Sequence, residues 1–188
     1  MAQIVFLDTD VMLDYLENRN QEIRDIVAQL LLLHKKEKIT LVTSVFNMAE
    51  LIDKEFEIHF IGWCLKERMS YDETFSKLRK DEELFKAISE KNEKGIKKRI
   101  EDFVSKNRIT ILSFSETEDY KSLYDLVYRR KLKSQDALVV AAALEWKATY
   151  FLSNDANLID KIADLFHAFK LRDKSAREAF RSNVLEAV

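Results

Sequence analysis

The chain has 188 residues, of which 47% are hydrophobic and 34% are charged, so it can bury a core beneath a strongly charged surface. Cys64 is the single cysteine, which excludes an internal disulfide and a cysteine-rich zinc site. Proline is absent and glycine occurs twice, which excludes long flexible linkers and a glycine-rich phosphate loop.

The first half of the chain alternates short apolar strands with helical patterns. The expected elements are a strand at Ile4–Leu7, helices at Val11–Glu17 and Gln21–Lys36, a strand at Ile39–Val42, and a long helix at about Val45–Lys66. The stretch that follows, at about 67–108, is the most charged part of the chain. Ser70 and Glu73 give it a capping-box start, and Gly95 predicts a break or a kink. We expect this stretch to be a helical insertion.

The second half continues the alternation. The expected elements are a strand at Ile109–Leu112, a helix from a capping box at Ser115 and Glu118 to about Arg130, a helix at Gln135–Lys147 capped by Ser134, a strand at Tyr150–Leu152, a helix around Leu158–Leu165, a short strand at His167–Phe169, and a final helix. Strands that alternate with helices favour a mostly parallel sheet covered on both faces. The sequence therefore predicts a single three-layer α/β/α domain over residues 1–188.

Four acidic residues stand where a core-building pattern does not explain them. Asp8 ends the first strand and Asp155 follows the strand at 150–152, while Glu50 interrupts an apolar helix. Asp136 lies in the first turn of an Ala/Leu/Val-rich helix, where negative charge is favoured. Ligands collect at the carboxyl ends of parallel strands, and clustered carboxylates are tolerated mainly around a cation. The pattern predicts a divalent-metal site, although Asp8, Asp136 and Asp155 are also explained as residues at helix starts.

Four segments around these acids resemble, in order along the chain, the four acidic motifs of PIN-domain ribonucleases. The segments are Phe6–Asp14, Ala49–Leu51, Gln135–Ala142 and Phe151–Leu158. That family includes VapC-type toxins of toxin–antitoxin pairs and RNA-processing endonucleases. The resemblance implies a PIN-like fold and an endoribonuclease that hydrolyses RNA phosphodiester bonds with Mg²⁺ or Mn²⁺.

The resemblance also implies roles for individual residues. The metal ligands and catalytic acids would be Asp8, Glu50, Asp136 and Asp155. Thr9 and Ser153 would orient these carboxylates or a water. Asp10 occupies a position where the family usually has asparagine or serine, so it is a further candidate at the site.

Basic residues shortly precede Asp136 and predict an electropositive rim for the RNA backbone. They are Arg129, Arg130, Lys131 and Lys133. The alternative is a solvated helix end whose cations complement the helix dipole. RNA is therefore the expected partner, with an antitoxin protein and a second copy of the chain as further partners. No signal peptide or membrane-length apolar run is visible, so we expect a cytoplasmic protein without a membrane partner.

Two other functions stay open. Asp8 and Asp10, separated by one residue, also resemble the opening of haloacid-dehalogenase-type phosphatases, with Asp8 as nucleophile and Asp10 as general acid/base. Thr43 or Ser44 would then bind phosphate, but Asp136 would have no task and the usual glycine after the motif is missing. The other alternative is a PIN-like binding module with weak or no catalysis.

Overall fold

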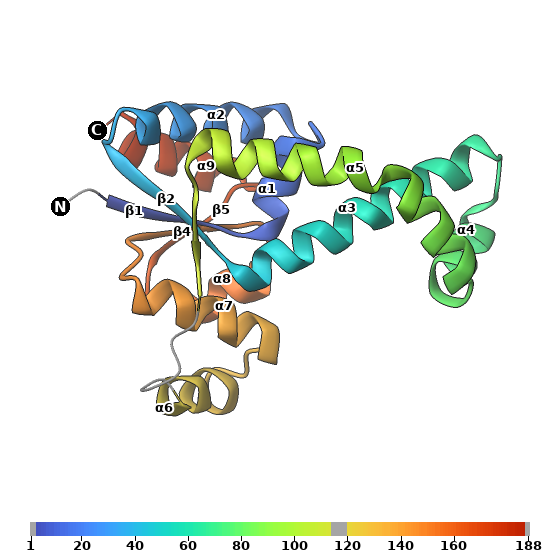
Figure 1. The fold of residues 1–188 in the computed structure, drawn as a ribbon. Coiled ribbons are helices and arrows are strands. Elements are labelled where there is room, and N and C mark those ends of the chain that lie inside the picture. Colours follow the sequence, from blue (N-terminus) through green and yellow to red (C-terminus); the bar gives the residue numbers. More distant parts are fainter. Residues whose placement is uncertain (1–2, 114–119, 187–188) are drawn as a thin grey trace. The chain divides into compact units, whose positions relative to one another are not determined.

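The computed structural model describes residues 3–113 and 120–186 of the chain. Within this part, five strands form one sheet of order β3-β2-β1-β4-β5, and all neighbouring pairs are parallel. The strands are β1 (Gln3–Leu7), β2 (Ile39–Ser44), β3 (Thr110–Leu112), β4 (Tyr150–Ser153) and β5 (His167–Lys170). The expected strands and their parallel arrangement are confirmed, and β1 occupies the centre of the sheet (Figure 1).

The helices alternate with the strands as the sequence predicted. They are α1 (Thr9–Leu16), α2 (Gln21–Lys35), α3 (Val45–Lys66), α4 (Tyr71–Lys80), α5 (Glu82–Asn107), α6 (Tyr120–Tyr124), the π-helix η1 (Asp125–Arg129), α7 (Ser134–Glu145), α8 (Ala156–Ile162), α9 (Lys174–Phe180) and the π-helix η2 (Arg181–Leu185). The α/β class is therefore confirmed.

Contacts along the chain divide it into two compact units. Residues 1–48 and 107–188 form the first, which contains the whole sheet and is called the sheet unit. Residues 49–106 form the second, called the helical unit, which contains α4, α5 and most of α3. The charged stretch expected at about 67–108 falls almost entirely within the helical unit.

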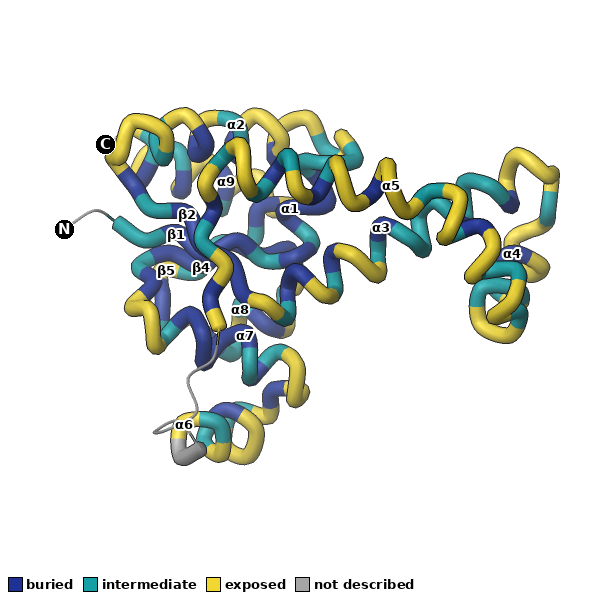
Figure 2. Tube along the Cα trace, in the orientation of Figure 1, coloured by how far each residue is buried: buried dark blue, intermediate teal, exposed yellow. Residues whose placement is uncertain are grey.

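Apolar side chains on both faces of the sheet explain why this unit folds in three layers. Figure 1 shows α1, α2 and α9 on one face and α7 and α8 on the other. Phe6 and Phe151 stack on neighbouring strands, with ring centroids 4.8 Å apart, and share a core with residues of α7 and α8. On the opposite face, Phe180 of α9 contacts Tyr150 and Phe169. Figure 2 shows that buried residues dominate the three inner strands β1, β2 and β4, as expected for parallel strands covered on both faces, whereas the edge strands β3 and β5 are less buried.

The helical unit has a small core of its own. Phe60 and Cys64 of α3 pack with Ile88 of α5. The predicted capping box of Ser70 and Glu73 starts α4 and is confirmed. Helix α5 continues through residue 95, so the predicted break at the glycine is absent.

Helix ends in this chain use a left-handed backbone conformation without glycine. Six residues with positive φ lie one or two residues after the last residue of a helix: Asn18, Glu37, Arg68, Arg108, Lys131 and Lys147. At Lys147 the two hydrogen bonds of a Schellman motif are present, from its N–H to Leu144 O (2.9 Å) and from Ala148 N–H to Ala143 O (2.9 Å). A side chain in this conformation is strained, so these ends are a local cost to stability.

Two helix starts differ from the sequence expectation. The predicted cap at Ser134 is wrong, because α7 already begins at Ser134 and its N-cap residue is Lys133, which makes no side-chain capping bond. Helix α8 begins at Ala156, earlier than expected, because the Asp155 side chain caps it. The capping box expected at Ser115 and Glu118 lies outside the described residues.

Candidate active site

The carboxyl ends of the central strands β1 and β4 bring the first and last predicted motifs together. Asp8 follows β1 as the N-cap residue of α1, and its Oδ1 accepts a hydrogen bond from Thr9 N–H (2.8 Å). Asp155 follows β4 and caps α8, accepting from Asn157 N–H and Leu158 N–H. Both aspartates therefore cap helices, which is the alternative role that the sequence pattern also indicated.

Asp8 is also held by side chains from two other parts of the sheet unit. Ser153 Oγ donates to Asp8 Oδ2 (2.6 Å), which links the ends of β4 and β1 directly. Asn47 Nδ2 donates to Asp8 Oδ1 (2.6 Å) and to Thr9 Oγ1 (3.1 Å). Three directional contacts fix this carboxylate, which is more than a helix cap requires.

Asn47 is the residue of this network that the sequence reasoning missed. It is fully buried in the first turn of α3, and Ser44 at the end of β2 accepts from its N–H (3.1 Å) and donates to its Oδ1 (2.5 Å). Thr9 Oγ1 donates to Asn47 O (3.3 Å). A buried amide that connects Ser44 to Asp8 orients the carboxylate through a satisfied polar network. The sequence signal that could have identified Asn47 is a polar residue inside an apolar helical turn.

Asp10 forms a second link between β1 and β4. Asn154 N–H donates to both carboxylate oxygens of Asp10 (2.9 and 3.1 Å), and Asn154 Nδ2 donates to Asp14 Oδ2 (2.9 Å). Burial, followed by repulsion from Asp8 and Asp14, raises the pKa of Asp10 to about 8, against the opposing effects of Asn154 N–H and Arg172. Asp10 is therefore neutral through much of the physiological pH range in the metal-free protein.

Asp136 lies in the first turn of α7 and is partly buried. Burial raises its pKa, and repulsion from Asp155 raises the pKa further, while Lys133 and Lys161 act in the opposite direction. We call Asp8, Asp10, Asp136 and Asp155 the acidic edge. Glu50, the fourth predicted metal ligand, lies on α3 in the helical unit, whereas the acidic edge belongs to the sheet unit.

The four residues of the predicted basic rim differ in how far hydrogen bonds and ion pairs within the protein engage their side chains. Arg130 donates to both carboxylate oxygens of Asp164 (2.6 and 2.7 Å) and to Lys161 O (3.0 Å), which ties η1 to the end of α8. The Asp164 hydrogen bonds raise the pKa of Arg130. Arg129 pairs with Asp125 (3.1 Å) and stays largely exposed. Arg130 is therefore a tether within the sheet unit, while Arg129, Lys131 and Lys133 are exposed.

The side chains that define the acidic edge offer carboxylate oxygens as donors. Hard cations such as Mg²⁺ and Mn²⁺ prefer such oxygen donors. Burial is the main cause of the raised pKa values of Asp10 and Asp136, and repulsion from neighbouring carboxylates adds to it. Asn154 Oδ1 is buried and accepts no hydrogen bond from the residues that the structure describes. Among those same residues, no three His, Cys, Asp or Glu side chains are arranged to hold a metal ion.

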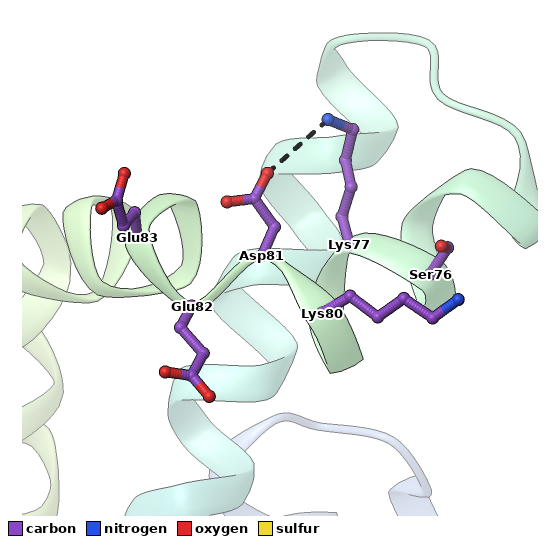
Figure 3. A pocket seen from close by; sticks show the side chains of 6 residues that line it. All are labelled: Ser76, Lys77, Lys80, Asp81, Glu82 and Glu83. Atoms are coloured by element: carbon purple, nitrogen blue, oxygen red, sulfur yellow. Dashed lines mark ion pairs between the residues drawn. The ribbon is translucent and has the colours of Figure 1, made fainter.

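A separate cleft of about 470 Å³ lies in the helical unit, around the junction of α4 and α5 (Figure 3). Lys77 and Asp81 face one another across it as an ion pair of 3.9 Å, while Glu82 and Glu83 point to different sides. The lining is charged apart from one serine. Ligand pockets are mostly apolar, so this cleft is a solvated surface feature.

Comparisons of the chain with known proteins do not identify the function of this site. Within the described ranges, none of the helices combines the length and the apolar character needed to cross a bilayer. Searches against protein-family models, curated proteins and solved structures give no match. The resemblance to PIN-domain ribonucleases rests on the motif residues alone and stays a prediction.

Proposed function

We propose that the chain is a Mg²⁺- or Mn²⁺-dependent endoribonuclease whose reaction takes place at the acidic edge. The observation that carries this proposal is the pair of links between β1 and β4, Ser153 Oγ to Asp8 and Asn154 N–H to Asp10. They gather carboxylates at the strand ends where open parallel sheets bind ligands. Acids with strongly perturbed pKa values are common at functional sites, which supports the same location.

The reaction would be hydrolysis of an RNA phosphodiester. Oxygen of water forms a bond to phosphorus, the P–O bond to the leaving ribose oxygen breaks, and that oxygen takes up a proton. Asp8, Asp136 and Asp155 would hold the ion, with Glu50 assigned from the sequence pattern alone. When bound, such an ion supplies Lewis-acid stabilisation of phosphate charge and lowers the pKa of water.

The residues around Asp8 have a positioning task in this proposal. Asn47 and Ser153 fix the Asp8 carboxylate through hydrogen bonds of 2.6 Å each. Asp10 holds the backbone of Asn154, the residue before Asp155, at the end of β4. A preorganised set of oxygens loses little freedom when the substrate and cation bind, which favours catalysis.

A phosphatase that uses Asp8 as nucleophile is the second candidate. It is favoured by Asp10, whose pKa of about 8 is that of a carboxyl group able to act as a general acid near neutral pH. It is opposed by Thr43 and Ser44, which are fully buried and engaged with Leu7 O and Asn47, so neither hydroxyl is presented to a phosphate. The nuclease proposal is therefore preferred.

The test is cleavage of a mixed-sequence single-stranded RNA in Mg²⁺, Mn²⁺ or EDTA. Wild type is compared with Asp8→Asn and Asp136→Asn, with Asp160→Asn on the exposed surface of α8 as a matched control. Metal-dependent internal cuts that vanish in the first two variants and persist in the control support the nuclease. Hydrolysis of p-nitrophenyl phosphate that requires Asp8 but not Asp136, without RNA cleavage, would instead establish the phosphatase.

The biological setting follows from the same proposal. An RNA substrate agrees with the cytoplasmic location expected from the sequence. An antitoxin protein and a homodimer are proposed partners by the resemblance to VapC-type toxins. Co-expression with the neighbouring gene product and light scattering of the purified chain test these two assignments separately.

A further inference from the structure

Two tyrosines on the surface of the sheet unit form an exposed aromatic stack. Tyr124 and Tyr128 have ring centroids 5.3 Å apart and ring planes inclined by 22°. The two residues are 55% and 60% exposed. Lys131 Nζ lies 4.6 Å from the centroid of the Tyr128 ring, a cation–π contact. Val127, between the two tyrosines, is also exposed, so the two rings belong to a contiguous apolar surface, and such surfaces mark interaction sites more often than singly exposed residues do.

The stack belongs to a segment that contacts α7 and α8, the helices that carry Asp136 and Asp155 of the acidic edge. Tyr124 is the last residue of α6, and Tyr128 lies in the adjoining π-helix η1, in which Arg130 N–H bonds to Asp125 O (3.1 Å). Single π-helical turns are frequent at functional sites. Leu126 and Leu132 anchor this segment in the core beside residues of α7. Arg130 ties it to the end of α8. Helix α7 carries Asp136 in its first turn, and α8 is capped by Asp155.

The charge around the stack suits a polyanion. Residues 124–133 contain four cations and a single anion, although the whole chain has a net charge of -2. Asp125 pairs with Arg129 and the Arg130 guanidinium is engaged with Asp164, while Lys131 and Lys133 are exposed. Aromatic rings for bases beside cations for phosphates are the combination found in proteins that bind single-stranded nucleic acids.

We propose that Tyr124 and Tyr128 form a base-stacking platform that binds unpaired nucleotides of RNA beside the acidic edge. This inference rests on the proposed function for the identity of the polymer. Every base offers a π-face, so the platform binds without a strict sequence code. Bases within a duplex are already stacked and paired, so the platform selects single-stranded segments.

The test is binding of a fluorescein-labelled twelve-nucleotide oligouridine in EDTA, followed by fluorescence anisotropy at low salt. Because EDTA removes the divalent cation, binding is measured apart from cleavage. Tyr124→Leu and Tyr128→Leu retain apolar bulk and remove the aromatic face, whereas Tyr128→Phe retains the face and removes the hydroxyl. Tyr71→Leu is the matched control, since Tyr71 is exposed on α4 and also stacks on an aromatic neighbour, Phe75.

The platform predicts that each of the two leucine variants weakens binding about 5- to 100-fold, the range expected for loss of one base–aromatic contact. Tyr128→Phe and Tyr71→Leu are expected to stay within about twofold of wild type, and duplex RNA of equal length should bind without regard to either tyrosine. The platform is overturned if both leucine variants bind oligouridine as tightly as wild type does. It is also overturned if the wild-type chain does not bind oligouridine. A dimer that becomes monomeric in these variants, with unchanged RNA affinity, would assign the stack to a protein interface.

The two proposals fail in different ways. Tyrosine-dependent binding in EDTA without RNA cleavage in any metal supports the platform and contradicts the nuclease. Metal-dependent cleavage with tyrosine-independent binding supports the nuclease and overturns the platform.

Discussion

Replacing Asp10 with asparagine removes a carboxyl group that the fold disfavours in its charged form. Burial and the neighbouring carboxylates Asp8 and Asp14 raise its pKa from 3.8 to about 8, while the Asn154 N–H and the Arg172 side chain only partly compensate. Asparagine keeps an oxygen that can accept from Asn154 N–H and carries no charge at any pH. We therefore expect Asp10→Asn to stabilise the metal-free protein.

The size of the effect follows from proton linkage. Below pH 3.8 the carboxyl group is protonated in both the folded and the unfolded chain, so it makes no difference to stability. Between pH 3.8 and about 8 the unfolded chain releases the proton and the folded chain retains it, so the wild type loses stability as pH rises. Each pKa unit corresponds to about 1.4 kcal/mol, which gives a cost of about 4 kcal/mol at pH 7. Above about pH 8 the loss is complete.

The assay is urea unfolding of wild type and Asp10→Asn in EDTA at pH 4, 5.5, 7 and 8.5. The free-energy difference between them should be near zero at pH 4 and grow to a few kcal/mol at pH 7. Asp160→Asn, at an exposed position of α8, is the control, and its free energy of unfolding is expected to stay within about 0.5 kcal/mol of wild type at every pH. An Asp10→Asn variant that is no more stable than wild type at pH 7, or a gain that does not vary with pH, would refute the reasoning.

Three further predictions concern the polar network, the helix ends and the cation. Asn47→Ala should destabilise the chain by about 2–4 kcal/mol in urea unfolding, because it leaves buried partners unsatisfied, and a loss below about 1 kcal/mol would contradict that role. Lys147→Gly should stabilise the chain by about 0.5–1 kcal/mol, because glycine adopts the positive φ at this position without strain. The control Lys94→Gly, inside α5, should destabilise the chain by about 1 kcal/mol. Equal effects of the two substitutions would argue against strain at residue 147. Millimolar Mn²⁺ should raise the melting temperature of wild type and leave that of Asp8→Asn nearly unchanged, and an equal rise in both proteins would place the cation elsewhere.

Local patterns were sufficient to predict the strands and their parallel arrangement. Short β-branched and aromatic runs predicted β1, β2 and β4, and the alternation with helices predicted a parallel sheet. Once the strands are parallel, residues that follow them must share one edge, which is why Asp8 and Asp155 were expected near each other. The hydrogen bond from Ser153 to Asp8 joins residues 145 positions apart and is consistent with that inference.

Features that depend on distant partners were not predictable from local patterns. Asn47 reads as an ordinary polar residue near a helix start, and its importance comes from burial against Asp8. The high pKa of Asp10 depends on burial and on repulsion from Asp8 and Asp14, and its hydrogen-bond donor Asn154 comes from the far end of the chain. The stack of Tyr124 and Tyr128 forms where α6 continues into the π-helix η1, a conformation that hydrophobic periodicity does not predict. Lys133 became the N-cap residue of α7 in place of Ser134.

The central claim is that the acidic edge binds a divalent cation, and the most direct test is the position of Mn²⁺ in crystals of the protein. Anomalous diffraction from crystals grown with millimolar Mn²⁺ should show a peak between Asp8, Asp136 and Asp155, and the peak should disappear in Asp8→Asn. A fully ordered acidic edge without a peak, or a peak confined to another surface, would contradict the account.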